Sequence, residues 1–299
     1  MDTDTFTKSR SALPLAGGLA ALLPVFGSAN EPTHRDLEYA RVGEPETALL
    51  LDLYLPEEVT NPPLIVWVHG GAWRTGSKER MPIGGMLEHG FAIASLNYRL
   101  SPVAPFPAQV HDIKAAIRWL RAHNETYGYR DDEITLAGAS AGGHLAALVG
   151  LTNGHAELEG DVGDFTDESS RVSAIVDFYG PTNFLTILSQ STPHGLGVRI
   201  PALQLLLRAQ PEDAPDLAQL ASPVFHVDKN DPPILIFHGD QDPQVPINQS
   251  HELVGSFKAA GLENRVLFEV IHGGAHGGDP FYKEARLEII SRFLNDSLP

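Results

Sequence analysis

Cysteine is absent from the 299-residue sequence, and basic residues are scarce. Without thiols the chain has no disulfide, no cysteine nucleophile and no cysteine-based zinc site. Lysine and arginine total 21 against 38 acidic residues, which gives a formal net charge of −17. A chain this acidic repels phosphate backbones, so the composition argues against a nucleic-acid partner. No uninterrupted apolar run is long enough to span a membrane, whereas a hydrophobic content of 42% can fill a sizeable core.

The first 29 residues have a pattern typical of a secretory signal peptide. Lys8 and Arg10 precede a weakly polar stretch over residues 11–26, and small residues follow at 27–29. Aspartates and prolines within this segment leave a second interpretation open, in which the start of the chain has no targeting role. The pattern favours a secreted or periplasmic protein, with a cytoplasmic one as the alternative.

From residue 30 onward the sequence alternates between strand and helix patterns. Apolar runs predict strands, and apolar residues at helical spacing predict helices between them. This alternation favours one α/β domain over residues 30–299, with a mostly parallel sheet of about eight strands and helices on both faces. The predicted strands are 48–55, 64–68, 91–96, 134–137, 172–178, 234–237 and 266–270, and the predicted helices include 107–123, 140–151, 248–260 and one near the C-terminus.

Residues 181–222 interrupt this rhythm, because they lie between two predicted strands and contain no strand pattern of their own. Their most apolar part is 195–209. We therefore expect a cap-like insertion over the carboxyl ends of the strands.

The segment Gly138-Ala-Ser-Ala-Gly142 follows a predicted strand and opens a predicted helix. This is the pattern of a nucleophile elbow, in which a strained turn carries the serine and the flanking positions must lack bulk. A glycine-rich dinucleotide turn also joins a strand to a helix, but its G-x-G-x-x-G pattern is missing here. The motif therefore predicts that Ser140 is a nucleophile.

An elbow requires donors for the oxyanion that forms when the serine attacks. The segment His69-Gly-Gly-Ala-Trp73 follows an earlier buried strand, and its small residues allow the backbone to approach a substrate. We expect the N–H groups of Gly71, Ala72 and Ala141 to form this oxyanion hole. His69 is expected to hold the loop in place, and Trp73 to pack nearby or to contact substrate.

A serine nucleophile also requires an acid and a base, in the chain order Ser, Asp, His. Asp240 and Asp242 both follow a buried strand, and Asp242 is favoured because it lies farther into the loop. After the last strand, His276 lies deeper in a glycine-rich loop than His272 and is favoured as the general base. These choices predict a triad of Ser140, His276 and Asp242.

Two segments could also be interpreted as metal sites, but their patterns fit a metal less well than the triad motifs fit a serine hydrolase. His272, His276 and Asp279 have a spacing that resembles zinc ligands, but the intervening glycines argue against the helix that such a site needs. Residues 157–168 are acidic but lack the ligand order of an EF-hand. The expectation there is a solvated loop, with a bound cation as the alternative, and no metal ion is predicted at the site.

Taken together, these motifs resemble the α/β-hydrolase family of bifunctional acetylxylan and feruloyl esterases, and more broadly the hormone-sensitive-lipase-like esterases. The resemblance covers about residues 37–297 and is carried by residues 69–78, 96–107, 138–147, 221–223, 238–246 and 274–277. It implies the same triad and the same oxyanion donors. The chain departs from the family at Asn183, where members usually carry aspartate, and over residues 194–210.

The resemblance implies a serine esterase that needs no cofactor and removes acetyl or feruloyl groups from plant polysaccharide such as xylan. Its partner would be a small ester or an esterified polysaccharide. Two alternatives remain. One is an arylformamidase or another small-acyl deacylase, and the other is a non-catalytic hydrolase fold used for binding.

Overall fold

The structure is a computed structural model that describes Met1 and residues 31–298. The predicted signal segment, residues 1–29, lies outside the described residues apart from Met1. The strands are β1 His34–Val42, β2 Thr47–Tyr54, β3 Leu64–Val68, β4 Ala92–Leu96, β5 Ile134–Ala139, β6 Ala174–Phe178, β7 Ile234–Gly239 and β8 Val266–Ile271. The α-helices are α1 Ala108–Ala122, α2 Asn124–Tyr127, α3 Ala141–Gly150, α4 Ala156–Glu159, α5 Phe184–Gln190, α6 Pro193–Leu207, α7 Pro215–Leu220, α8 Asn248–Ala259 and α9 Glu284–Ser297.

The strands form one eight-stranded sheet in the order β1-β2-β4-β3-β5-β6-β7-β8. β3 to β8 run parallel to one another, and β2 lies antiparallel to both β1 and β4. The prediction of a mostly parallel sheet is confirmed. Because the parallel strands end at one edge, the loops after β3, β5, β7 and β8 open on the same side of the sheet.

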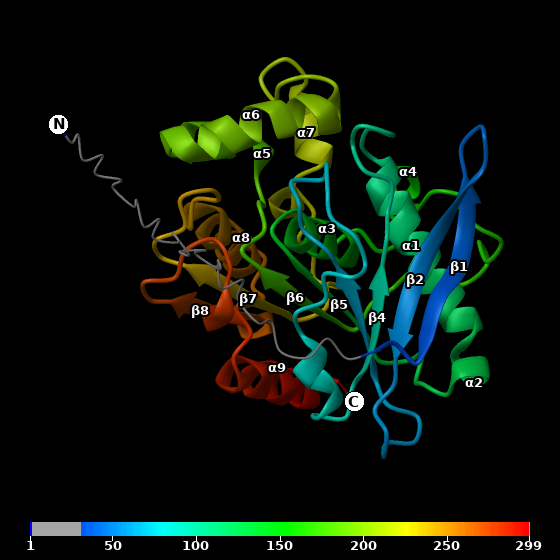
Figure 1. The fold of residues 1–299 in the computed structure, drawn as a ribbon. Helices are drawn as coiled ribbons and strands as arrows, with labels where there is room; N and C mark the ends of the chain where they lie inside the picture. Colours follow the sequence, from blue (N-terminus) through cyan, green and yellow to red (C-terminus); the bar gives the residue numbers. More distant parts are fainter. Residues whose placement is uncertain (2–30, 299) are drawn as a thin grey trace.

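Side chains alternate between two apolar cores along each central strand. In β3, Leu64 and Val66 belong to the core that α1, α3 and α8 share on one face, whereas Ile65 and Trp67 belong to the core that contains α9 on the other. Helices therefore cover both faces, as Figure 1 shows. This burial explains why β3 has the continuous apolar sequence of a strand covered on both sides.

The sequence prediction missed β1. Its sequence, HRDLEYARV, carries four charged residues, and its pairing with β2 contains two register irregularities. These irregularities shift which residues face the core, so the strict alternation that marks a half-covered strand is lost.

Residues 181–222 contain α5, α6 and α7, which gather beyond the end of the sheet toward which β4 points (Figure 1). α6 is tied to the body of the protein by a hydrogen bond from the Phe106 N–H to the Leu206 carbonyl (2.8 Å). Asn183, where the family pattern differs, caps α5 through its side chain and also donates to Glu252 (2.7 Å). Within residues 31–298, no helix has both the length and the apolar character needed to cross a bilayer.

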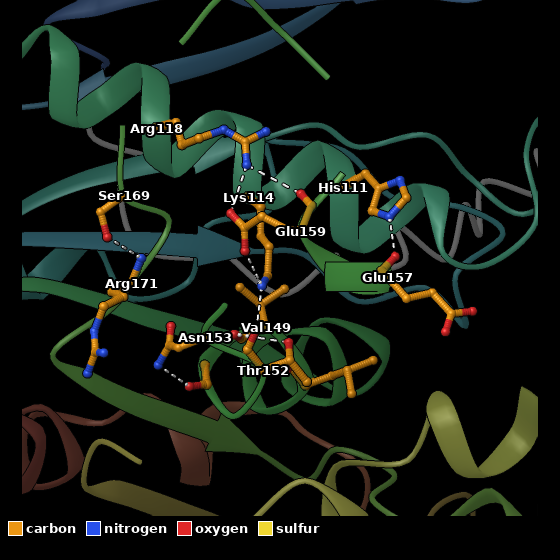
Figure 2. Close-up of polar contacts among 12 residues, drawn as sticks. His111, Lys114, Arg118, Val149, Thr152, Asn153, Glu157, Glu159, Ser169 and Arg171 are labelled. Carbon is orange, nitrogen blue, oxygen red and sulfur yellow. Dashed lines mark hydrogen bonds and ion pairs between the residues drawn. The ribbon is translucent and has the colours of Figure 1, made fainter. Parts of the chain in front are cut away.

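The acidic segment 157–168 is only partly the solvated loop that its composition suggested. Glu159 ends α4 and pairs with Lys114 (2.9 Å) and Arg118 (2.9 Å), two buried cations from α1 (Figure 2). The expectation was therefore wrong for Glu159, because buried cations on α1 require a carboxylate partner. Within the described ranges, no group of three or more histidine, aspartate or glutamate side chains is placed to hold a metal ion.

Replacing Glu159 with glutamine should lower the free energy of unfolding by about 2–3 kcal/mol, measured by urea denaturation. The change leaves Lys114 and Arg118 buried without a counter-charge. We place the loss below that of a fully buried pair because the Glu159 side chain is 31% exposed. Glu157→Gln is the matched control, since Glu157 is exposed and its carboxylate points away from Lys114 in Figure 2. An equal loss of unfolding free energy in the two variants would contradict the role of Glu159 as the counter-charge of Lys114 and Arg118.

Candidate functional site

Ser140 occupies a strained turn between β5 and α3. Its backbone has φ 56° and ψ −118°, and its N–H donates to the Phe178 carbonyl at 2.8 Å. A Cβ atom at Gly138 would lie 2.3 Å from the Gly142 carbonyl oxygen, and one at Gly142 would lie 2.0 Å from the Val68 oxygen. No side chain fits at either position, which explains why glycines flank the serine in the sequence.

The structure brings Ser140, His276 and Asp242 together, although they lie far apart in the sequence. His276 Nε2 is 2.9 Å from Ser140 Oγ, and His276 Nδ1 is 2.7 Å from Asp242 Oδ2. The three residues follow β5, β8 and β7, so they meet where these strands end. An ionised carboxylate only accepts hydrogen bonds, so Nδ1 carries the imidazole proton and Nε2 is left to accept from the serine hydroxyl.

Asp242 is held as a buried, ionised carboxylate. Its Oδ1 accepts from the N–H groups of Gln244 (2.8 Å) and Val245 (3.0 Å). Burial raises the pKa of Asp242, but the nearby His238 ring and the hydrogen bond from His276 outweigh that effect and hold the pKa well below its usual range. The carboxylate therefore stays charged and can fix the tautomer of His276 throughout the neutral range.

His238 is a contributor that the sequence analysis missed. It is fully buried in β7, its Nδ1 accepts from the Ser250 hydroxyl (2.7 Å), and its Nε2 donates to the Val245 carbonyl (2.9 Å). The same Nε2 lies 3.4 Å from Asp242 Oδ2. The sequence offered one sign of this contribution, a histidine four residues before Asp242. The polar partners that orient this histidine come from elsewhere in the fold.

His272 and Asp240, the two candidates that the sequence did not favour, form a separate pair at the surface. His272 Nδ1 lies 3.0 Å from Asp240 Oδ2, and the His272 side chain is 87% exposed. His272 and His276 thus contact different carboxylates and do not converge on one point. This arrangement does not match the zinc-like spacing noted in the sequence.

The loop after β3 lies against the serine turn. A Cβ atom at Gly70 would be 3.4 Å from the Ser140 Cβ, and Gly71 has φ 118° with its Cβ position blocked by the Thr75 carbonyl. Ala72 also has a positive φ, of 53°. Among the described residues, the N–H groups of Gly71, Ala72 and Ala141 donate to no other main-chain group. These three N–H groups flank the serine without a main-chain acceptor within residues 31–298; Gly71 and Ala72 are half-buried, and Ala141 is fully buried.

His69 holds this loop rather than reacting. Its ring stacks on Tyr98 with centroids 4.5 Å apart, and its Nδ1 donates to the Gly70 carbonyl (2.8 Å). Burial lowers the pKa of His69 to about 4, so the imidazole is neutral at physiological pH. A neutral, stacked ring with a fixed donor matches the structural role expected from the sequence.

Of the two roles expected for Trp73, packing and contact with substrate, the structure shows packing, with the side chain at 0% exposure. Its Nε1 donates to His144 Nδ1 (3.1 Å), and its ring packs edge-on against Phe184 of α5 (5.5 Å between centroids). The helices after residue 181 cover the indole, and sequence patterns give no sign of that coverage. Trp73 therefore packs between the loop after β3 and α5.

A buried carboxyl group lies behind the elbow on β6. Asp177 is fully buried, its Oδ1 accepts from the Gly180 N–H (2.8 Å), and its Oδ2 has no hydrogen-bond partner in the described part of the chain. Burial raises the pKa of Asp177 from 3.8 to about 6. The ionised form is therefore costly in the folded protein at neutral pH.

Asp177→Asn should stabilise the protein above pH 6 and have little effect near pH 4. The native pKa lies above the unfolded value, so stability from this group is fully present below about pH 4 and is lost as pH rises through about 6. The gain at pH 8 is at most about 2–3 kcal/mol, since one pKa unit corresponds to about 1.4 kcal/mol. Thermal unfolding of the variant across pH 4 to 8 measures it, with the exposed Asp167→Asn as control. A gain that does not depend on pH would contradict this account.

Comparison with known proteins agrees with the fold. The BD-FAE family model matches residues 51–257. Esterase LipQ of Mycobacterium tuberculosis is 32% identical over 240 residues, which cover 79% of this chain and 55% of LipQ. The chain spans about half the length of the curated relatives it matches.

Two solved structures are also similar. A truncated carbohydrate esterase from gut microbiota superposes with a TM-score of 0.80 at 33% identity, covering 88% of this chain and 95% of that one. Propionate-bound esterase 2 of Thermogutta terrifontis superposes with a TM-score of 0.70 at 27% identity, covering 89% and 94%. The resemblance inferred from the sequence motifs is confirmed: the chain belongs to the BD-FAE family and has the α/β-hydrolase fold.

Proposed function

We propose that the protein is a serine carboxylester hydrolase in which Ser140 is the nucleophile, His276 the general base and Asp242 the orienting carboxylate. One observation carries the proposal: an unbroken hydrogen-bond chain runs from the serine hydroxyl through the imidazole to a buried carboxylate. The N–H groups of the adjacent glycine loop support it. The names of the similar proteins, all esterases, point to the same reaction class.

The reaction follows from the hydrogen-bond directions. His276 Nε2 takes the Ser140 proton as Oγ attacks the ester carbonyl, and Asp242 stabilises the imidazolium that forms. The N–H groups of Gly71, Ala72 and Ala141 receive the oxyanion of the tetrahedral intermediate. His276 then protonates the leaving alcohol, and a water molecule releases the acid from the acyl-enzyme by the same steps in reverse. These residues supply every proton transfer, so the mechanism requires no cofactor.

Acetyl or feruloyl groups on a polysaccharide are the substrates that we propose. The similar gut protein is named a carbohydrate esterase, and the targeting pattern of residues 1–29 would bring the enzyme to a polymer outside the cell. In this proposal residues 181–222 act as a cap that contacts the sugar or the acyl group, since α5, α6 and α7 lie beyond the strand ends (Figure 1).

Covalent labelling tests the nucleophile directly. Phenylmethylsulfonyl fluoride should modify a single serine, and peptide mass spectrometry should place the label on Ser140. His276→Ala should lose the labelling, because the hydroxyl is then no longer activated. Label at another serine, or no label in an active preparation, would refute the assignment. No labelling together with no ester hydrolysis would favour a hydrolase fold used only for binding.

A substrate panel tests the chemistry of the substrate. Acetylated xylo-oligosaccharides, methyl ferulate and N-formylkynurenine should be compared by kcat/KM, with product release followed by chromatography. The proposal predicts that the two esters are turned over faster than the formamide. A reversed order would identify a deacylase of small amides, and a steep fall beyond acetyl would restrict the acyl group to small size.

A further inference from the structure

Arg199 of α6 is a buried cation without a counter-ion. Its exposure is 1%, and its Nε and Nη1 have no hydrogen-bond partner. The other buried cations of the described chain all have carboxylate partners: Lys78 pairs with Asp52 at 2.8 Å, and Lys114 and Arg118 pair with Glu159. No carboxylate of residues 31–298 lies within ion-pair distance of Arg199. Burying an unpaired guanidinium costs desolvation free energy, so the presence of Arg199 in the interior needs an explanation.

The Arg199 guanidinium keeps its charge. Burial lowers the pKa of Arg199 to about 10, and the negative charge of Asp242 partly opposes that shift. The side chain is therefore protonated at physiological pH. Its central carbon lies 5.6 Å from the centroid of the Trp73 ring, so the indole covers one side of the group. An aromatic face attracts the charge but accepts none of the N–H hydrogen bonds along the guanidinium edges.

Two observations place Arg199 near the loop after β3 and near the loop that carries Asp242. Trp73, which it contacts, lies two residues after Gly71 in the loop after β3. One turn earlier on the same side of α6, a Cβ atom at Gly195 would lie 2.9 Å from the Gln244 carbonyl, in the loop that carries Asp242. The start of α6 is fastened to the same loop by the Thr192 hydroxyl, which donates to the Pro243 carbonyl (2.7 Å). Helix α6 thus places the unpaired positive charge of Arg199 near both the loop after β3 and the loop that carries Asp242.

We propose that Arg199 binds a carboxylate carried by the substrate, so that the enzyme prefers esters with a second, ionised carboxyl group, such as acetylated uronic-acid sugars. This rests on the proposed esterase function. A carboxylate supplies the acceptors that the guanidinium lacks, in the planar geometry that arginine matches best. With a net charge of −17, the protein as a whole repels anions, so a preference for them must come from a local group.

Matched pairs of esters test the proposal and locate the carboxylate. On the alcohol side, 4-acetoxybenzoate is compared with the neutral 4-acetoxybenzamide. On the acyl side, monomethyl glutarate is compared with methyl glutaramate. The wild-type enzyme should favour the carboxylate member of at least one pair. Arg199→Met should lower kcat/KM for that member by roughly 10- to 100-fold, chiefly through KM, and change the amide by less than about twofold.

Arg208→Met is the matched control, because Arg208 lies just after α6 and is exposed. It should leave both members of each pair unchanged. Equal kcat/KM for carboxylate and amide in both wild-type pairs would overturn the proposal. A loss of equal size for both members in Arg199→Met would also overturn it, because the arginine would then act only by supporting the loops.

Direct binding separates this inference from the proposed function. Calorimetry measures the Kd for 4-acetoxybenzoate in two variants. The Kd should be at least tenfold higher in the Ser140→Ala, Arg199→Met double variant than in Ser140→Ala. If the wild-type protein hydrolyses no ester but this difference appears, the esterase proposal fails while the carboxylate site stands. If neutral esters are hydrolysed and the two Kd values are equal, only the carboxylate site fails. Should the Arg199 variant not fold, the wild-type comparison of carboxylate with amide still decides.

Discussion

Ser140→Ala should reduce kcat for 4-nitrophenyl acetate by roughly 10⁶-fold, with little change in the thermal unfolding midpoint. The hydroxyl that is removed is the first member of the hydrogen-bond chain through His276 to Asp242. Because the three residues act as a unit, losing one disables the other two. The remaining rate, still ~10³-fold above that in water, would come from the oxyanion donors and from substrate binding.

Initial rates measured with purified protein at high enzyme concentration check this expectation, and circular dichroism confirms folding. Ser250→Ala is a useful comparison. Its hydroxyl donates to His238 Nδ1, so the variant removes a buried hydroxyl at the site without removing the nucleophile. Turnover that survives Ser140→Ala within tenfold would exclude the proposed mechanism.

Asp242→Asn should lower kcat by roughly 10⁴-fold while leaving the fold intact. The asparagine carbonyl can still accept from the N–H groups of Gln244 and Val245, which hold Oδ1 in the native protein. Its NH₂ group must then face His276 Nδ1, where the carboxylate now accepts a hydrogen bond. The imidazole is driven to carry its proton on Nε2, which is the wrong tautomer for removing the proton of Ser140.

Asp240→Asn supplies the matched control, because this carboxylate contacts the exposed His272 and the Gly273 N–H, and in the described structure no hydrogen bond or ion pair joins it to the triad. It should retain activity within about twofold, as expected for a surface substitution. The comparison separates the two aspartates that the sequence offered. A larger loss in Asp240→Asn than in Asp242→Asn would reverse their roles.

Sequence reasoning reached the parts of the site that local chemistry dictates. A side chain at Gly138 or Gly142 would collide with backbone atoms of the turn and of β3, so the motif alone predicted the serine that starts the hydrogen-bond chain. The depth of Asp242 and His276 in their loops distinguished them from Asp240 and His272, since a residue farther from the strand end can fold back over the sheet. The continuous apolar runs predicted the parallel sheet, because a strand that is buried on both faces carries apolar residues at successive positions.

What the sequence did not reveal depends on contacts between distant segments. The burial of Trp73 is produced by α5 and α6, more than 100 residues later in the chain. The pairing of Glu159 with Lys114 joins two helices whose charges look solvated when each is read alone. His238 contributes through a hydroxyl and a carbonyl that lie beyond its own strand. In each case the partner, rather than the residue itself, determines the role.

His276 follows β8, which is one of the two edge strands of the sheet and, among the described strands, pairs with β7 alone. Most of its side chains are only half-buried, unlike those of β3, β5 and β6. Edge strands of this kind fray before the centre of a sheet melts. In rising denaturant the imidazole would then separate from the serine while the interior strands remain paired, so enzymatic inactivation should run ahead of the loss of far-ultraviolet ellipticity.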